Sequence, residues 1–307
     1  MQIIILYALV VLIWGSTWVA ITFQLGPVAS EVSVAYRFAI ASLVLFAYAF
    51  VSRRRTRIPL THYPMVMLQG AILFSANYLF VYYGTAHLTS GLIAVLFSVI
   101  VVFNSLFEKF FFGTPVEAKL LVAAALGAIG VALMFWSEVA QFTLQDDSVL
   151  GILLIAIAII LASLGNMTAV VNTSRNLPVV AVNAHAMAWG ALTSACIAWI
   201  LGYDFNFSLS PGYVWSLLYL SVFGSAVAFG CYLALIRSIG SARAAYSSVL
   251  FPLVALTLST FFEGYVWTGE AVAGIALILG GNWMALAGKQ RRAQEMLPGI
   301  EGESKNE

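Results

Sequence analysis

Charged residues are scarce in this sequence. Lys, Arg, Asp and Glu make up 9% of the 307 residues, whereas a soluble domain has about 25%. Hydrophobic residues reach 62%, and the mean hydropathy is +0.97. A water-soluble fold of this length could not enclose so large an apolar fraction. The composition therefore excludes a cytosolic enzyme and a disordered chain, and it predicts an integral membrane protein.

Cysteine and histidine are scarce as well. The two cysteines, Cys196 and Cys231, lie in apolar runs without CxxC spacing, and the three histidines are far apart and form no HExxH motif. The sequence also lacks Walker, GxSxG and GxGxxG motifs. These absences predict that the protein is not an enzyme and holds no metal or cofactor. The net charge of +1 with scattered basic residues predicts no nucleic-acid partner.

Long apolar runs, in contrast, are abundant. A transmembrane helix needs about 20 mostly apolar residues, whereas a barrel strand alternates. The runs here are long, do not alternate, and lie at 3–23, 32–51, 65–84, 90–112, 117–136, 149–170, 180–201, 213–236, 244–262 and 269–287. They predict an all-α protein with ten transmembrane helices, followed by a polar tail at 288–307.

The basic residues gather on one side of this predicted topology. With ten helices, both termini and the even-numbered loops share a side, and that side carries 13 of the 14 Lys and Arg residues. Arg37 is the exception. Because basic loops stay in the cytoplasm, we expect both termini to be cytoplasmic, the loop 137–148 to be external, and the protein to lie in the cell (inner) membrane.

The two halves of the chain resemble each other. Glu117, Ala123 and Gly127 recur as Glu270, Ala276 and Gly280, and Phe107-Glu108 recurs as Phe262-Glu263. The pattern predicts two five-helix repeats, at 1–136 and 149–287. Since five is odd, the second repeat would be inverted in the membrane, which is typical of alternating-access transporters.

Several motifs point to a family. The sequence has Trp14-Gly15-Ser16-Thr17 in its first run, Tyr36-Arg37-Phe38 after Pro27, and in each half a Ser-rich start followed by a run that ends in Phe-Glu. Over residues 3–287 it resembles the EamA-type branch of the drug/metabolite transporter superfamily. This resemblance implies a secondary transporter that exports small metabolites, often amino acids.

Polar and aromatic residues inside the runs are the candidate substrate-binding residues. Arg37 lies roughly 10 Å along its helix from Ser30, where a charge is costly and often functional; it is a candidate carboxylate ligand, or alternatively a structural side chain. The other candidates are Trp14, Thr17, Trp18, Asn77, Tyr78, Tyr82, Asn104, Asn166, His185, Trp189, Tyr232 and Tyr246. As alternatives, such aromatics can anchor helices at the membrane interface and such amides can bond between helices.

Other readings remain open. The spacing of small residues at Ala123 and Gly127, and at Ala276 and Gly280, indicates close helix packing within the chain or a homodimer contact. The expected partners are a small-molecule substrate and the lipid bilayer. Efflux of hydrophobic drugs is the alternative function, and an intramembrane enzyme or a channel would be a different class.

Overall fold

The computed structural model describes residues 2–113, 118–134, 147–175, 177–232, 234–235, 247–262 and 267–295. These residues form helices and short connections, with no strand among them. The first half comprises α1 (Gln2–Thr22), α2 (Ser30–Val51), η1 (Leu60–His62), α3 (Tyr63–Ala71), η2 (Ile72–Ala76), α4 (Asn77–Thr85), α5 (Ser90–Ser98), α6 (Ile100–Phe112) and α7 (Ala118–Met134). The second half comprises α9 (Asp147–Ser174), α10 (Val179–Ile200), α11 (Pro211–Ser221), η3 (Val222–Val227), α13 (Ser247–Phe262) and α14 (Gly269–Glu295).

Several of these elements join into longer spans. The stretch Leu60–Thr85 runs through α3, η2 and α4, Ser90–Phe112 joins α5 and α6, and Pro211–Tyr232 continues beyond η3. Within the described residues, seven helices are long and apolar enough to cross a membrane. Each of the ten predicted runs overlaps with a described helix or joined span. The largest difference is in the last run, which we expected to end at 287, because α14 continues to Glu295 into the predicted polar tail. The protein is therefore an all-helical, multi-pass membrane protein.

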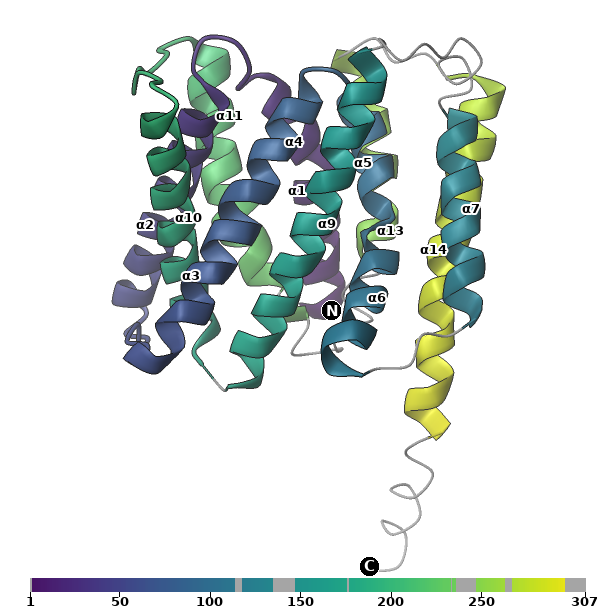
Figure 1. Cartoon of the computed structure of the whole chain (residues 1–307), viewed down its shortest axis with the longest axis horizontal. Helices are drawn as coiled ribbons and strands as arrows, with labels where there is room; N and C mark the ends of the chain where they lie inside the picture. Colours follow the sequence, from purple (N-terminus) through teal and green to yellow (C-terminus); the bar gives the residue numbers. More distant parts are fainter. Residues whose placement is uncertain are drawn as a thin grey trace, which may run out of the picture.

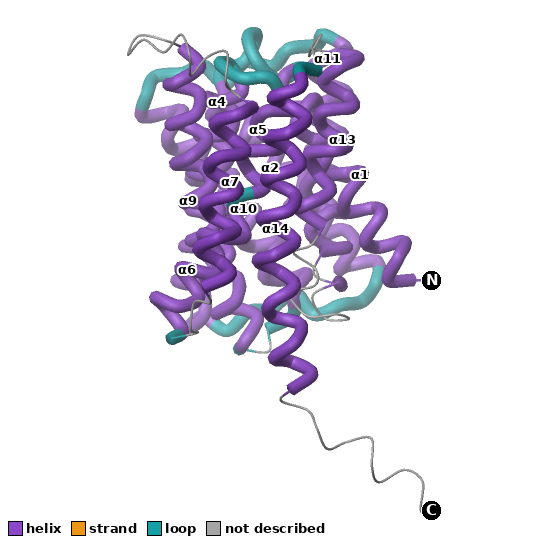
Figure 2. The backbone as a smooth tube through the Cα atoms, turned by 90° about the vertical axis from the view of Figure 1, so that its right-hand side faces the viewer, coloured by secondary structure: helices purple, strands orange, loops and turns teal. Residues whose placement is uncertain are grey.

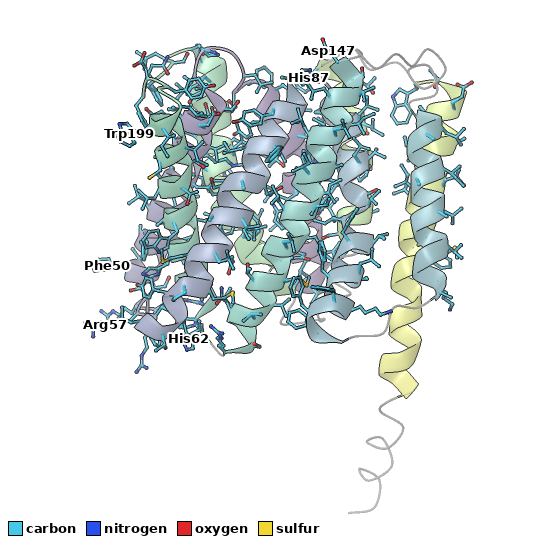
Figure 3. All side chains as sticks on the ribbon, in the orientation of Figure 1. Phe50, Arg57, His62, His87, Asp147 and Trp199 are labelled. Atoms are coloured by element: carbon cyan, nitrogen blue, oxygen red, sulfur yellow. The ribbon has the colours of Figure 1, made fainter. Side chains whose placement is uncertain are left out.

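The outer surface of the bundle is apolar, as a hydrocarbon solvent requires. Phe50 and Trp199, labelled in Figure 3, are 85% and 76% exposed. Figure 2 shows the helices running side by side along one direction.

The helices pack in definite pairs. α2 lies along α10, α1 along α13, α4 along α9, and α5 also packs against α13. α7 lies along α14, and Figure 1 shows this pair at one edge of the molecule. The last helix of each half therefore contacts the other within one chain, while the bundle around α2, α4, α9 and α10 forms the larger core.

Two glycines allow α7 and α14 to approach closely. A Cβ on Gly130 would lie 2.6 Å from the Gly274 carbonyl oxygen, and a Cβ on Gly281 would lie 2.8 Å from the Ala123 carbonyl oxygen. By contrast, a Cβ on Gly127 would meet only Val99, at 3.7 Å. The predicted close packing is found: the Ala123 backbone lies in the contact as expected, whereas Gly130 and Gly281 take the places that we expected for Gly127 and Gly280.

Two short π-helical segments interrupt the α-helical pattern. η2 (Ile72–Ala76) lies between α3 and α4, and η3 (Val222–Val227) follows α11. A π segment holds one extra residue in a turn and often occurs at functional sites. Both segments contribute to or border the cavity described below.

The basic loop after α2 and the two ends of the chain share one end of the bundle. Figure 1 places the N-terminus and the end of α14 toward the lower end. In Figure 3, Arg57 and His62 lie at that lower end, whereas His87 and Asp147 lie at the upper end. Within the described part of the chain, the loop 52–59, the start of α1 and the end of α14 thus lie on one side.

Candidate functional site

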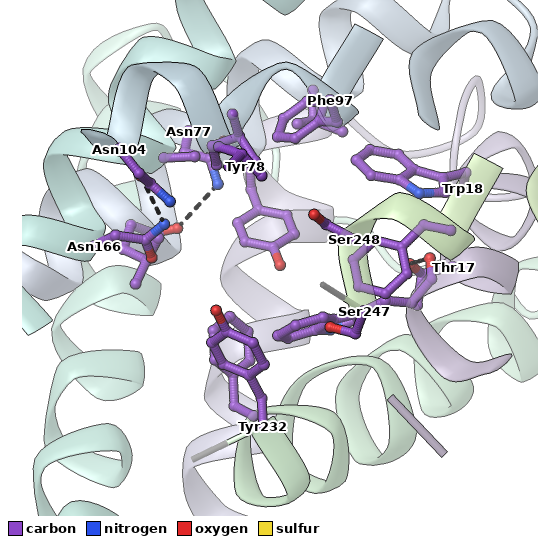
Figure 4. A pocket seen from close by; sticks show the side chains of 18 of the residues that line it. Thr17, Trp18, Asn77, Tyr78, Phe97, Asn104, Asn166, Tyr232, Ser247 and Ser248 are labelled. Carbon is purple, nitrogen blue, oxygen red and sulfur yellow. Dashed lines mark hydrogen bonds between the residues drawn. The ribbon is translucent and has the colours of Figure 1, made fainter. Parts of the chain in front are cut away.

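A cavity of about 150 Å³ lies in the middle of the bundle (Figure 4). This volume is comparable to that of a cavity that holds one benzene ring. Its wall is mostly apolar, with a few polar groups. It is formed by Trp14, Thr17, Trp18, Ile21, Leu73, Asn77, Tyr78, Val81, Phe97, Ile100, Val101, Asn104, Ala162, Asn166, Phe229, Tyr232, Ser247, Ser248 and Phe251.

One face of α1 supplies four of these residues. Four residues follow the i, i+3, i+4, i+7 spacing of a helical stripe, and all four line the cavity: Trp14, Thr17, Trp18 and Ile21. Neighbouring helices hold this face in place. The Trp14 indole Nε1 donates to the Gly224 carbonyl oxygen in η3 at 3.1 Å.

Aromatic rings surround Trp14. Its ring centroid lies 5.0 Å from that of Phe229, 5.1 Å from that of Tyr232 and 5.7 Å from that of Phe251. One turn along α1, Trp18 lies 4.8 Å from Phe97, centroid to centroid. These edge-on and tilted contacts fix the rings, so the aromatic wall is largely preformed.

Three amides from three helices form the polar end of the cavity. The Asn104 Oδ1 accepts hydrogen bonds from Ser163 Oγ at 2.7 Å and from Asn166 Nδ2 at 3.4 Å. Asn77 Nδ2 donates to the Leu73 carbonyl oxygen at 3.3 Å, while its buried Oδ1 has no protein partner. Figure 4 shows these amides on one side, and Tyr232, Ser247 and Ser248 across the cavity. The structure thus brings together residues that are far apart in the sequence.

Arg37 does not line the cavity. Its side chain is 1% exposed, and its Nε donates to the Ser225 hydroxyl at 3.1 Å. The guanidinium carbon lies 4.5 Å from the centroid of the Tyr78 ring. Since Tyr78 lines the cavity, Arg37 sits one side chain behind the wall, in contrast to the direct contact that we expected.

Three other candidates also lie outside the cavity wall, and a fourth is not among the described residues. Tyr82 is fully buried beside Arg37. His185 contacts the rings of Phe46 and Tyr63, and its Nδ1 is 2.9 Å from the Ala181 carbonyl oxygen. Trp189 packs on α3, where a Cβ on Gly70 would lie 2.8 Å from its own Cβ. Tyr246 lies outside the described residues.

His185 and Trp189 were therefore assigned to the wrong environment. Both lie on α10 toward α2 and α3, because α10 packs against these helices and not against the cavity. A residue's position along a helix does not give its direction around the helix axis.

Several lining residues were missed. Phe97, Phe229 and Phe251 lie in runs that are apolar on all sides, so a single sequence gives no signal for the side that faces a cavity. Ser247 and Ser248 lie in the first turn of α13. The Ser-rich start in each half was the available signal for them, and it was used only as a family motif.

Within the described residues, no group of three or more His, Cys, Asp or Glu side chains could hold a metal ion. Two charged groups act on the wall from behind it: Arg37 lies against the Tyr78 ring, and Glu108 interacts electrostatically with Tyr232. The arrangement suits binding of a small solute through rings and amides.

Comparison with known proteins identifies relatives along almost the whole chain. The model of the EamA-like transporter family matches residues 1–136 and 149–287. Protein PagO from Salmonella typhimurium is 24% identical over 277 residues, covering 90% of each chain. The uncharacterized transporter YoaV from Bacillus subtilis is 22% identical over 277 residues, covering 88% of this chain and 90% of its own length.

The fold also has a solved counterpart. A protein crystal structure aligns with 95% of this chain and 98% of its own chain, at a TM-score of 0.69 and 19% identity. At that identity the likeness shows the fold alone. Because the family model covers both halves, and the described helices enclose a central cavity, the chain belongs to the EamA-like transporter family.

Proposed function

We propose that this protein is a secondary transporter that exports small amphipathic metabolites, such as amino acids, by alternating access. The observation that carries the proposal is the central cavity, whose wall comes from helices of both halves of the chain. A solute bound there contacts both halves, so a movement of one half against the other changes its access to either side.

Two features support an inverted repeat of five helices. First, the pattern of helix contacts is preserved when each span is replaced by the span five places further on in the chain, or five places earlier. The α1 contact with α13 becomes the α9 contact with α5 and α6. The pairs α2 with α10 and α7 with α14 are each unchanged, because their two members exchange places. The π segments η2 and η3 occupy the third and eighth spans, offset by about 150 residues. A pseudo-two-fold axis in the membrane plane would relate such halves.

The distribution of charge supports the orientation. Four arginines follow α2 in the loop 52–59: Arg53, Arg54, Arg55 and Arg57. This loop lies at the end of the bundle where α1 begins and α14 ends. Under the positive-inside rule this end is cytoplasmic. We place the protein in the cell (inner) membrane on this basis.

Buried hydrogen bonds close the opposite end. Gln24 Nε2 donates to the Tyr213 carbonyl oxygen at 2.8 Å, and the hydroxyls of Ser33 and Tyr213 are 3.0 Å apart. Tyr83 donates to the carboxylate of Glu31. These bonds tie α1, α2, α4 and α11 together, and alternating access would require some of them to break.

The cavity chemistry supports the substrate class. Ring faces of Trp14, Trp18 and Tyr78 offer apolar contact, whereas the amides of Asn77, Asn104 and Asn166 offer donors and acceptors. Pockets of this kind take solutes that combine an apolar body with a few oriented polar groups. We assign substrate contact to these residues together with Thr17 and Tyr232.

Transport by the purified full chain tests the proposal. Proteoliposomes are loaded with an unlabelled amino-acid mixture, and exchange with external labelled phenylalanine, leucine and serine is measured against protein-free liposomes. We expect exchange of at least one of the three, competed by the others. No exchange of any amino acid, together with uptake of a hydrophobic cationic dye, would replace this proposal by drug efflux.

A further inference from the structure

The side chain of Arg37 carries a charge that the described residues leave without a counter-charge. Its contacts are the Ser225 hydroxyl and the rings of Phe38 and Tyr78, none of which is anionic. Its Nη1 is buried and has no hydrogen-bond partner. Burying a charged guanidinium inside a membrane protein costs free energy, and such a group is normally paired with an anion. A bound anion would therefore stabilise Arg37 at this position.

The nearest acid on the same helix does not meet this need. Glu31 lies six residues from Arg37, roughly 9 Å along the helix axis, and accepts a hydrogen bond from Tyr83. Glu31 is also near the N-terminus of α2, where the helix dipole stabilises a carboxylate. Its charge is therefore compensated by other groups.

A second buried polar group lies beside the guanidinium. The Tyr82 hydroxyl makes no hydrogen bond of normal geometry, and it lies close enough to Arg37 to interact with that side chain both electrostatically and as a hydrogen-bonding group. An anion next to Nη1 could accept hydrogen bonds from both the guanidinium and this hydroxyl. Charge-assisted bonds of that kind are about twice as strong as neutral ones.

Only a thin layer separates this pair from the cavity. The Tyr78 ring lies against the guanidinium on one side and lines the cavity on the other. Thr17, which also lines the cavity, meets Arg37 across Gly224: a Cβ on Gly224 would lie 2.8 Å from Thr17 Cγ2 and 3.5 Å from Arg37 Nη2. Gly224 and Ser225 both belong to the π segment η3, so this one turn contacts Thr17 in the cavity wall and Arg37 behind it.

We propose that the Arg37 guanidinium and the Tyr82 hydroxyl form an anion-binding site behind Tyr78, which a carboxylate or a small inorganic anion reaches when the Tyr78 ring turns aside. The inference deepens the proposed function, and it rests on that function only where the anion is the carboxylate of a transported solute. The two sources share one chemistry, and the experiment distinguishes them.

Ligand-dependent thermal unfolding of the purified full chain tests the site without requiring transport. The probes are sodium phenylacetate, its neutral amide phenylacetamide, and sodium chloride, at an ionic strength held constant with sodium HEPES. We expect an anion to raise the unfolding midpoint at concentrations at least roughly tenfold lower than phenylacetamide requires. An effect of phenylacetate assigns the site to organic carboxylates, and an effect of chloride alone assigns it to inorganic anions.

Matched variants locate the effect. Arg37→Lys and Tyr82→Phe should each weaken the anion effect at least several-fold. Arg54→Lys and Tyr48→Phe make the same changes in an exposed pair, with the Arg54 guanidinium carbon 5.5 Å from the centroid of the Tyr48 ring, and should leave it unchanged. Tyr82→Phe removes only a hydroxyl, so it keeps the test available if Arg37→Lys does not fold.

Two results would overturn the site: no response of the wild-type protein to either anion, or the same response in Arg37→Gln and in wild type. Failure of amino-acid exchange with an intact anion response would remove the proposed substrate class and leave the site standing.

Discussion

Two buried polar atoms on the cavity residues have no partner in the protein. They are Asn77 Oδ1, an acceptor, and Trp18 Nε1, a donor. Leaving such a group unsatisfied costs about 1–3 kcal/mol. A solute that offers both a donor and an acceptor recovers part of this cost, which favours amphipathic metabolites over purely apolar compounds.

Asn104→Ala should weaken transport and stability together. The substitution removes the acceptor shared by Ser163 and Asn166, and two buried donors then lose their partner at a cost of about 1–3 kcal/mol. We expect a lower unfolding midpoint and a roughly tenfold loss of apparent affinity. Asn206→Ala is the control, because Asn206 is exposed and bonds the Pro27 carbonyl oxygen. Unchanged exchange in Asn104→Ala would exclude the amides from the substrate site.

Trp14→Ala should cost both folding and transport, because Trp14 packs against three rings and bonds η3. Truncation of such an aromatic costs about 3–5 kcal/mol in soluble cores. We expect reduced membrane yield, a lower unfolding midpoint, and reduced exchange per molecule. Trp199→Ala makes the same change at a 76% exposed position and should affect none of these. Normal exchange per folded Trp14→Ala molecule would assign Trp14 to packing alone.

At this scale, the sequence predicted which residues are candidates better than where they point. The stripe from Trp14 to Ile21 was predictable, because four positions of one helix face share a common surface whatever that surface contacts. The directions of Arg37, His185 and Trp189 were not predictable, since no stripe of several candidates on α2 or α10 marks one face of the helix. Their direction is set by packing of α2 and α10, which involves residues more than 100 positions apart.

Glycine position controls how helices α7 and α14 meet. Gly130 and Gly281 lie where the two backbones are closest, whereas Gly127 and Gly280, one turn or one residue away, have open space or ordinary contact distance around them. The spacing of small residues in the sequence predicted close helix packing. Which glycine makes it depends on the rotation of each helix, and composition does not fix that rotation.

Gly130→Ala should destabilise the protein by about 1–3 kcal/mol, since the added methyl group would overlap the Gly274 carbonyl oxygen. Gly127→Ala is the matched control on the same helix, and it should be neutral or stabilise by up to about 1 kcal/mol through helix propensity. Thermal unfolding of the purified variants measures both. Equal midpoints for the two variants would show that α7 and α14 do not approach as described.

The element boundaries were predictable, and the π segments were not. A bilayer requires about 20 apolar residues in each span, so the apolar runs mark the helices directly. A π segment depends on which backbone bonds form within a helix, and η2 and η3 have the same apolar composition as their flanking turns. The two π segments lie at corresponding positions of the sequence repeat, but the repeat alone does not indicate that a π segment occurs there.

The whole molecule is a bundle with one basic end. The loop 52–59, the start of α1 and the end of α14 share that end, and Asp147 lies at the other. If the predicted number of helices were wrong by one, basic and acidic loops would fall on the same side of the membrane. The separation of the two kinds of loop therefore depends on the whole predicted topology and not on any single helix.

Reporter fusions test this arrangement. A reporter fused after Arg292 should be cytoplasmic, and one inserted at Asp146 should be external. The reason is that 13 of the 14 basic residues lie on the same side of the predicted topology as the two termini, and basic loops stay in the cytoplasm. A reporter inserted after Arg55 serves as a second cytoplasmic control. An external signal after Arg292, or a cytoplasmic signal at Asp146, would contradict both the orientation and the inverted repeat.

The bond between Arg37 and Ser225 has a consequence for biogenesis, because the two residues are 188 positions apart. At roughly 5–20 residues per second, a ribosome needs roughly 10–40 s to make the intervening chain. During that time α2 must hold a charge that costs about 2.5–3.5 kcal/mol at a helix centre during insertion. Its own apolar side chains have to offset that cost, and the segment Ser30–Val51 is apolar enough to cross a membrane despite this charge. The apolar surplus of α2 thus serves membrane insertion first, and it becomes a packing surface only after the second half has been synthesised.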